Sequence, residues 1–145
     1  MKYFKLQEFV TSATAKKYKI DNTPSAIIVA HINELVDNVL DPLREAWAKH
    51  CEVGGLGKPG INVNSGYRCP ELNQKVGGAA KSAHMTGYAA DLSPINGKIK
   101  EFIAFCSEWI KNRAFDQCID EYQRWVHIGY KNSLGQSRKQ IFKIR

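Results

Sequence analysis

The sequence predicts an α+β domain in which helices pack on a small, mostly antiparallel sheet. Apolar residues recur every three or four positions between residues 27 and 47, as on a helix with one buried face. Short stretches of alternating apolar and polar residues gather in the last third, at 115–121, 125–130 and 140–144. Helices followed by a run of strands are typical of α+β folds. With 145 residues, 43% of them hydrophobic, we expect residues 1–145 to form one domain.

The first long helix is predicted to begin at Asn22, Thr23 and Pro24, which combine a capping side chain with a proline in the first turn. Pro42 interrupts the apolar stripe that follows. Because proline lacks a backbone donor and crowds the preceding turn, we expect a kink there or a division into two helices. The stripe consists of Ile27, Ile28, His31, Ile32, Leu35, Val39, Leu43 and Trp47.

The middle of the chain alternates between strand and helix patterns. Residues 61–68 alternate as a half-buried strand does, and residues 70–76 fit a short helix. The segment 77–87 is rich in glycine and alanine, which favours a loop, and this loop leads into a strand at 88–92. A second helix is expected over residues 95–111, with one apolar and one charged face.

The chain is basic, with a net charge of +7 and a pI near 9.3. This balance favours an anionic partner, which charge alone leaves open among nucleic acid, a membrane surface and an acidic cell-wall polymer. The densest basic group, at 138–145, alternates with apolar residues as an end strand with a solvated face would. No nucleic-acid motif accompanies it, so we expect no nucleic-acid partner.

Two further patterns bear on the compartment. Lysines, a glutamate and a glutamine interrupt residues 1–15, where a secretory signal needs an apolar stretch, and no apolar run approaches the roughly 18 residues of a membrane span. We therefore expect synthesis in the cytoplasm and no membrane insertion. The four cysteines include no CxxC pair, which predicts reduced, mostly buried thiols. They are Cys51, Cys69, Cys106 and Cys118.

The segment 82-SAHMTGYAADL-92 places His84 and Asp91 seven positions apart with Gly87 between them. On a helix they would lie about 10 Å apart along the axis, so one metal ion binds both only if the chain bends, and Gly87 permits a bend. Asp91 falls in an apolar strand, where a buried carboxylate needs a cation or several donors. His127, in another strand, offers a third ligand for a zinc site with an open position for water.

Each of these residues also has a structural interpretation. Asp91 can cap a turn, His84 can be a loop histidine, and His127 can be a strand residue bonded to a neighbour. The two remaining histidines are assigned to packing: His31 lies in the helical stripe, and His50 falls in the last turn of the helix, where it meets the negative end of the helix dipole.

Ser82-x-His84-x-x-Gly87-x-Ala89-x-Asp91, followed by Trp125-x-His127, resembles the signature of the Hedgehog-type metallopeptidases. These are the zinc D-alanyl-D-alanine carboxypeptidases and the related phage L-alanyl-D-glutamate endopeptidases. The resemblance covers nearly the whole chain. It extends to 65-SGYRCPELN-73, similar to the family's strand-and-arginine segment, to 115-FDQCIDE-121, and to the opening 4-FKLQEFVTSATA-15 with 21-DNTPS-25, similar to a phage- and prophage-borne branch.

The resemblance implies that His84, Asp91 and His127 bind Zn²⁺ and that the substrate is a peptidoglycan stem peptide. We expect a monomer that acts on the cell wall, either as an endolysin after phage lysis or as a virion component. Which stem-peptide bond is cleaved, by carboxypeptidase or endopeptidase activity, stays open. The alternatives are a non-catalytic zinc-containing module that binds cell wall or serves in a virion, and a thiol hydrolase using Cys69 or Cys118.

The general base departs from the family pattern. Many members carry a glutamate three residues before the final histidine, where this chain has Arg124. Asp120 and Glu121 are the candidates. A three-residue loop at 122–124 would pair Glu121 with Trp125 and place it diagonal to His127, with Cα atoms about 7–8 Å apart. A two-residue loop would instead place Asp120 opposite His127. We favour Glu121, whose side chain is longer.

Three further residues are candidates for substrate binding. The resemblance suggests that Arg68 binds a substrate carboxylate, which suits the planar guanidinium fork, although a surface arginine is the competing interpretation. Ser82 and Gln117 are candidates for hydrogen bonds to the substrate or to the ligands.

Overall fold

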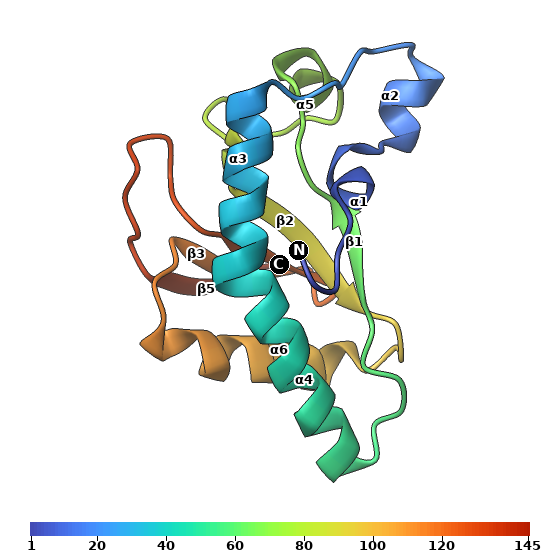
Figure 1. The fold of residues 1–145 in the computed structure, drawn as a ribbon, viewed down its shortest axis with the longest axis vertical. Helices are drawn as coiled ribbons and strands as arrows, with labels where there is room; N and C mark the ends of the chain where they lie inside the picture. Colours follow the sequence, from blue (N-terminus) through green and yellow to red (C-terminus); the bar gives the residue numbers. More distant parts are fainter.

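The computed structural model describes residues 1–145 and has a five-stranded sheet at its centre (Figure 1). The strand order is β1-β2-β4-β3-β5, and every neighbouring pair is antiparallel except β3 and β5, which are parallel. This confirms the predicted α+β class with a mostly antiparallel sheet. The strands are β1 (Ile61–Ser65), β2 (Ala89–Pro94), β3 (Gln117–Glu121), β4 (Trp125–Gly129) and β5 (Gln140–Ile144).

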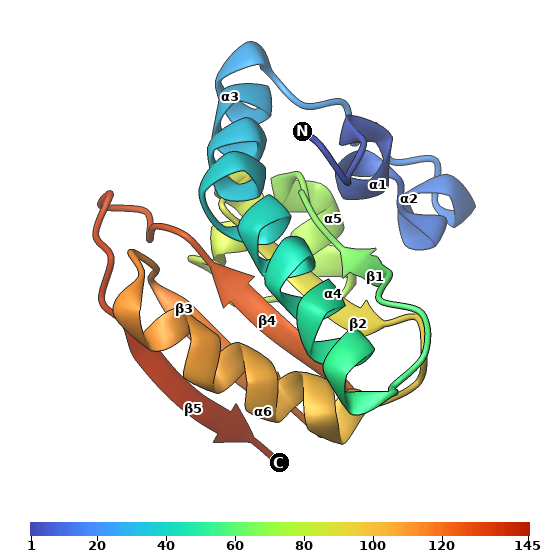
Figure 2. The same ribbon diagram turned by 60° about the horizontal axis from the view of Figure 1, so that its bottom comes forward.

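Helices cover one face of this sheet. Figure 2 shows α4 and α6 lying across it, and their shared core is built around Trp47, Phe102 and Leu92, all fully buried. The short helices α1, α2 and α5 lie toward the β1 edge. The helical elements are α1 (Leu6–Val10), α2 (Ala13–Lys17), α3 (Ala26–Leu35), the π-helical η1 (Val36–Leu40), α4 (Asp41–Gly54), α5 (Pro70–Lys75), the 3-10 helix η2 (Ala83–Thr86), α6 (Ile99–Trp109) and the 3-10 helix η3 (Ile110–Asn112).

The long helix begins later than predicted. Ser25 is its N-cap and accepts a hydrogen bond from the Ile28 amide, whereas the predicted cap, Asn22, is buried elsewhere. The Asn22 side chain donates to the carbonyls of Val10 and Tyr67, both at 3.0 Å, and accepts from the Cys69 amide at 2.8 Å. Asn22 therefore joins the N-terminal segment to the chain that follows β1.

Pro42 does not divide the helix in two, which was one of the two expectations: the backbone stays helical from Ala26 to Gly54. The chain passes through the π-helical segment η1 directly before Pro42, and the Asp41 amide donates to the carbonyl of Val36, five residues back. The Asn38 carbonyl, four residues before Pro42, accepts from Arg113 Nη2 at 3.4 Å. The extra residue in the π turn and this external donor accommodate the missing N–H.

Several boundaries differ from those predicted. The second helix starts at Ile99 and not at residue 95, because residues 95–98 turn first, with Gly97 at a φ of 75°. Ile27, placed on the buried stripe, is 68% exposed. No helix in the structure is long and apolar enough to cross a membrane.

Candidate active site

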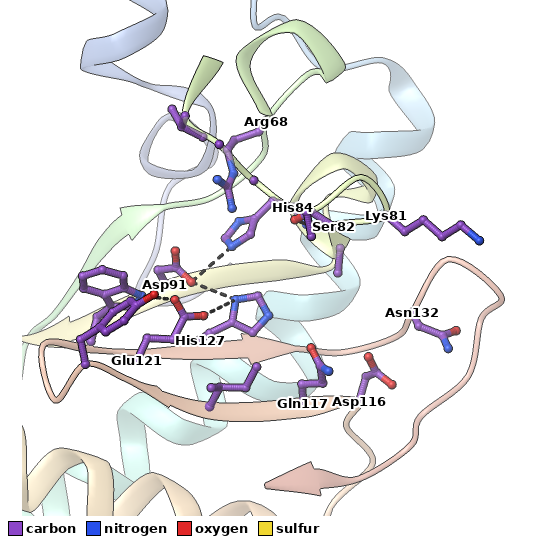
Figure 3. Close-up of a pocket in the computed structure, with 18 of the residues that line it drawn as sticks. Arg68, Lys81, Ser82, His84, Asp91, Asp116, Gln117, Glu121, His127 and Asn132 are labelled. Atoms are coloured by element: carbon purple, nitrogen blue, oxygen red, sulfur yellow. Dashed lines mark hydrogen bonds and ion pairs between the residues drawn. The ribbon is translucent and has the colours of Figure 1, made fainter. Parts of the chain in front are cut away.

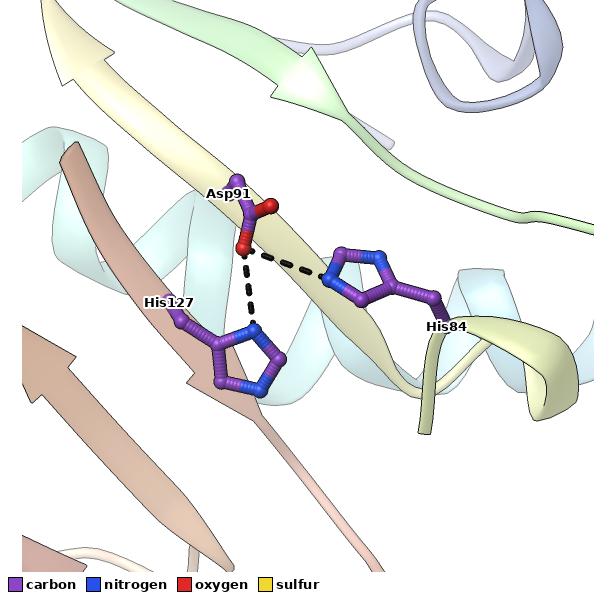
Figure 4. A group of neighbouring side chains, drawn as sticks. All are labelled: His84, Asp91 and His127. Carbon is purple, nitrogen blue, oxygen red and sulfur yellow. Dashed lines mark hydrogen bonds and ion pairs between the residues drawn. The ribbon is translucent and has the colours of Figure 1, made fainter. Parts of the chain in front are cut away.

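His84, Asp91 and His127 come together from η2, β2 and β4 (Figure 4). One ligand atom from each lies within 4.8 Å of the other two. Asp91 Oδ1 is 3.2 Å from His84 Nε2 and 2.9 Å from His127 Nδ1. The three side chains are only 2%, 12% and 10% exposed for His84, Asp91 and His127. Ionisable groups are seldom buried to this extent unless they are paired or bind a ligand.

The short helix η2 orients His84. The Ser82 hydroxyl caps η2 by accepting from the His84 amide at 3.2 Å, and Gly87 ends it at a φ of 84°. His84 Nδ1 lies 2.7 Å from the Gly66 carbonyl oxygen, which only accepts, so Nδ1 carries the proton. The other ring nitrogen, Nε2, faces Asp91 and is the atom positioned to bind a metal ion.

Strand pairing places the other two ligands. Asp91 lies directly opposite His127 in the antiparallel β2–β4 pair. Burial alone would raise the pKa of Asp91, but the hydrogen bonds and charge contacts with His127 and His84 outweigh it and hold that pKa below its usual range. Two imidazole nitrogens and an ionised carboxylate form a donor set that fits zinc, with a position left for a further ligand.

Glu121 lies beside this group at the end of β3. It pairs with Trp125 across a three-residue loop, so the hairpin has the register favoured from the sequence. Glu121 Oε2 accepts from Trp125 Nε1 at 3.1 Å, while Oε1 lies 3.8 Å from His127 Nδ1. Burial, followed by the negative charge of Asp91, raises the pKa of Glu121.

Asp120 lies on the other face of β3. It pairs with Val126 and not with His127, so the alternative two-residue loop is wrong. Its Oδ1 accepts from the Gln123 amide at 2.9 Å and thereby closes the turn. The structure brings Glu121, and not Asp120, next to the three metal-ligand candidates.

Glu121 and the three metal-ligand candidates line a cleft with a volume of about 520 Å³ (Figure 3). Arg68, Ser82 and Gln117, the candidates for substrate binding, form part of its wall. Arg68 Nε is buried and has no hydrogen-bond partner, while Gln117 Nε2 donates to Gln140 Oε1 at 2.9 Å. The Arg68 guanidinium is thus available to an anion in the cleft.

The other histidines and the cysteines take no part in the cleft. His31 stacks on Tyr88 with ring centroids 4.1 Å apart and contacts the Thr86 carbonyl, whereas His50 packs on Phe105. The four cysteines are free thiols; burial raises the pKa of Cys118 to about 12, and Cys69 caps α5 by accepting from the Leu72 amide. Cys118 is buried with a raised pKa, and the Cys69 sulfur is engaged in the cap of α5, which counts against the thiol-hydrolase alternative.

Further lining residues were not identified from the sequence as part of the site. Tyr122 and Trp125 pack edge to face beside Glu121. Lys81, Asp116, Asn132 and Arg138 lie toward the other end of the cleft. The Asp–Arg contact among them joins residues 22 positions apart, and no local sequence pattern indicates it.

Fold and site together define an α+β domain with a candidate mononuclear metal centre in an open cleft. A sequence model of the Peptidase M15 family matches residues 2–129, and the chain belongs to this family. It is also similar to the zinc D-Ala-D-Ala carboxypeptidase of Streptomyces albus G, with 44% identity over 46 residues. The aligned stretch covers 32% of this chain and 18% of the length of that relative.

Proposed function

We propose that this protein is a zinc metallopeptidase that hydrolyses peptidoglycan stem peptides. The observation that carries the proposal is the convergence of His84, Asp91 and His127 in a cleft, with the Glu121 carboxylate 3.8 Å from one of them. Membership of the Peptidase M15 family and similarity to a zinc D-Ala-D-Ala carboxypeptidase support it.

In this proposal His84, Asp91 and His127 hold the zinc ion. Zinc, when bound, makes a water molecule more acidic and polarises the carbonyl of the bond to be cleaved. Glu121 Oε1 accepts the proton of the attacking water, because Oε2 is engaged by Trp125. Its raised pKa suits this role and the later transfer of the proton to the leaving amine. No covalent intermediate on the protein is required.

Arg68 binds a substrate carboxylate next to the cleaved bond. Its buried, unpartnered Nε and planar fork suit a two-pronged contact to a carboxylate. The Ser82 hydroxyl proton and the second amide proton of Gln117 are left for the substrate, since Ser82 acts only as an acceptor in capping η2. We further propose that the protein acts as a monomer on the cell wall, as an endolysin or virion component; the similarity of residues 4–15 and 21–25 to a phage-borne branch supports this role.

Digestion of purified peptidoglycan tests the proposal. The released muropeptides are identified by mass spectrometry with the zinc-loaded protein, with the protein and a chelator, and after zinc is added back. We expect new peptide ends that disappear with the chelator and return with zinc, and none with the His84→Ala variant. Full zinc occupancy without hydrolysis would identify the non-catalytic cell-wall module instead, with Arg124 marking the lost family glutamate.

A further inference from the structure

One end of the cleft is built partly by residues that lie outside the family match. The match ends at residue 129, and the segment 130–139 then leads from β4 to β5. Asn132 and Arg138 of this segment line the cleft, with Lys81 of the 77–87 loop. In Figure 3, Asn132 and Lys81 lie at the end away from Glu121, with His127 between.

The distance along the cleft follows from β3. Ile119 pairs with His127, and Asp116 comes three residues earlier in the same direction. At about 3.3 Å per strand residue, Asp116 lies about 10 Å along the sheet from the metal centre. An extended peptide covers this distance with about three residues.

Asp116 fixes the orientation of Arg138. Asp116 is 1% exposed and accepts from Arg138 Nε at 2.7 Å, from Nη2 at 2.9 Å and from the Arg138 amide at 3.1 Å. This two-pronged pair occupies the Nε–Nη2 edge of the guanidinium. The opposite edge, formed by Nη1 and Nη2, stays free for a second planar anion, and the Arg138 side chain is 40% exposed.

The surrounding charge favours an anion at this end. The Asp116 carboxylate neutralises one positive charge, while Lys81 is exposed and has no ion-pair partner. The other acidic residues that line the cleft, Asp91 and Glu121, belong to the candidate metal centre and its neighbour on β3. A carboxylate is therefore the group that this end of the cleft fits.

We propose that Arg138, held in place by Asp116, is a specificity-determining residue that binds a second substrate carboxylate about three residues from the cleaved bond. This inference rests on the proposed peptidase function. Arg68 and Arg138 then contact the substrate at two separated points, which fixes how an acidic peptide lies across the metal centre.

Matched synthetic peptides test this assignment. Each pair carries either glutamate or glutamine three residues from the cleaved bond, on the amino side in one pair and on the carboxyl side in the other. With the zinc-loaded wild-type protein we expect kcat/KM to favour the glutamate peptide by on the order of 10-fold in one pair, mainly through KM, as for a charge-assisted hydrogen bond.

The decisive variant combines Arg138→Gln with Asp116→Asn, so that no buried carboxylate is left unpaired. It should lose the preference while it keeps its zinc. Lys143→Gln removes a positive charge from β5 outside this cleft and should keep the full preference. If the double variant does not fold, Arg138→Lys, which keeps the charge but not the fork, should lower the preference several-fold.

Two outcomes separate this inference from the proposed function. A wild-type enzyme that cleaves both peptides of each pair equally well, or variants that keep the preference, would overturn the role of Arg138 alone. If zinc-loaded wild type cleaves no peptide, the proposed function fails, and the Arg138 site is then tested by equilibrium binding of the same peptide pairs. Tighter binding of the glutamate peptide that the double variant loses would support the Arg138 site. Equal binding of the two peptides would overturn it.

Discussion

At the scale of single residues, the two carboxylate oxygens of Glu121 have different surroundings. The Trp125 indole holds Oε2 and turns Oε1 toward His127. In the proposed mechanism, the side chain therefore needs no reorganisation before it accepts a proton. Glu121 lies three residues before Arg124, the position where the resemblance expects the glutamate, and it approaches the candidate metal centre from the neighbouring strand β3.

Glu121→Gln keeps the size and the Trp125 contact but cannot accept a proton. We expect zinc content to stay at the wild-type level while kcat falls by about 10²–10⁴-fold, the usual contribution of a positioned general base. Zinc is measured by elemental analysis and kcat on a stem peptide. Asp120→Asn is the matched control, because its carboxylate closes the turn on the other face, and it should change kcat little. The reverse pattern would assign the base to Asp120.

Arg68→Ala tests the predicted substrate contact. Because its guanidinium makes no hydrogen bond to metal ligands, zinc should stay bound. KM for substrates with a free carboxylate beside the cleaved bond should rise by on the order of 10- to 100-fold, as expected for loss of a charge-assisted pair. Arg68→Lys should recover only part of this, since lysine lacks the fork. Kinetics unchanged by either variant would return Arg68 to a structural role.

At the scale of elements, Gly66 couples the N-terminal helix to the metal centre. A Cβ at this position would lie 2.5 Å from the Phe9 carbonyl oxygen, so only glycine allows α1 to approach the end of β1. The Gly66 carbonyl also accepts a hydrogen bond from His84 Nδ1. The same backbone unit therefore sets both the packing of α1 and the orientation of a ligand.

Gly66→Ala should lower the free energy of unfolding by about 1–3 kcal/mol, as overpacking does, and weaken zinc binding by about 10- to 100-fold through the displaced acceptor. Denaturant unfolding and competition with a chromogenic chelator measure the two effects. Gly54→Ala is the control: it lies in α4 with ordinary contacts, and alanine should be neutral or stabilising there. Loss of stability with unchanged zinc affinity would separate the two roles.

Elements defined by local patterns were predicted well, and those defined by distant contacts were not. β3, β4 and β5 follow from alternation, and their loop gave the correct pairing of Glu121 with Trp125. Asn22 and Ser25 are both good capping residues, and only the contacts of Asn22 with distant backbone groups decide that Ser25 caps the helix. The helices α1 and α2 are five residues each and depend on packing, which no local periodicity reveals.

The candidate site divides in the same way. His84 and Asp91 stand seven positions apart around a glycine, His127 follows in a recognisable strand pattern, and the structure places the three together. Arg138 and Asp116 meet only because β5 pairs in parallel with β3, a long-range arrangement that the sequence does not specify locally. Composition and spacing therefore point to the metal centre but not to the far end of its cleft.

At the scale of the whole molecule, the metal-ligand candidates tie together separate parts of the chain. η2, β2 and β4 each supply one ligand candidate, and the Gly66 carbonyl behind His84 adds the end of β1. An ion bound by all three residues therefore binds only the folded state, because unfolding separates residues that lie up to 43 positions apart in sequence. Metal binding and global stability are linked.

Zinc should consequently stabilise the whole domain. At a free zinc concentration 100 times the Kd, the free energy of unfolding should rise by about 2.7 kcal/mol, if the unfolded chain does not bind the ion. Thermal unfolding of the chelator-treated protein, with and without added zinc, measures this as a rise in Tm. His127→Ala should show no zinc-dependent rise, while Lys143→Gln should match wild type. A Tm that zinc leaves unchanged in wild type would mean that these residues do not form a zinc site.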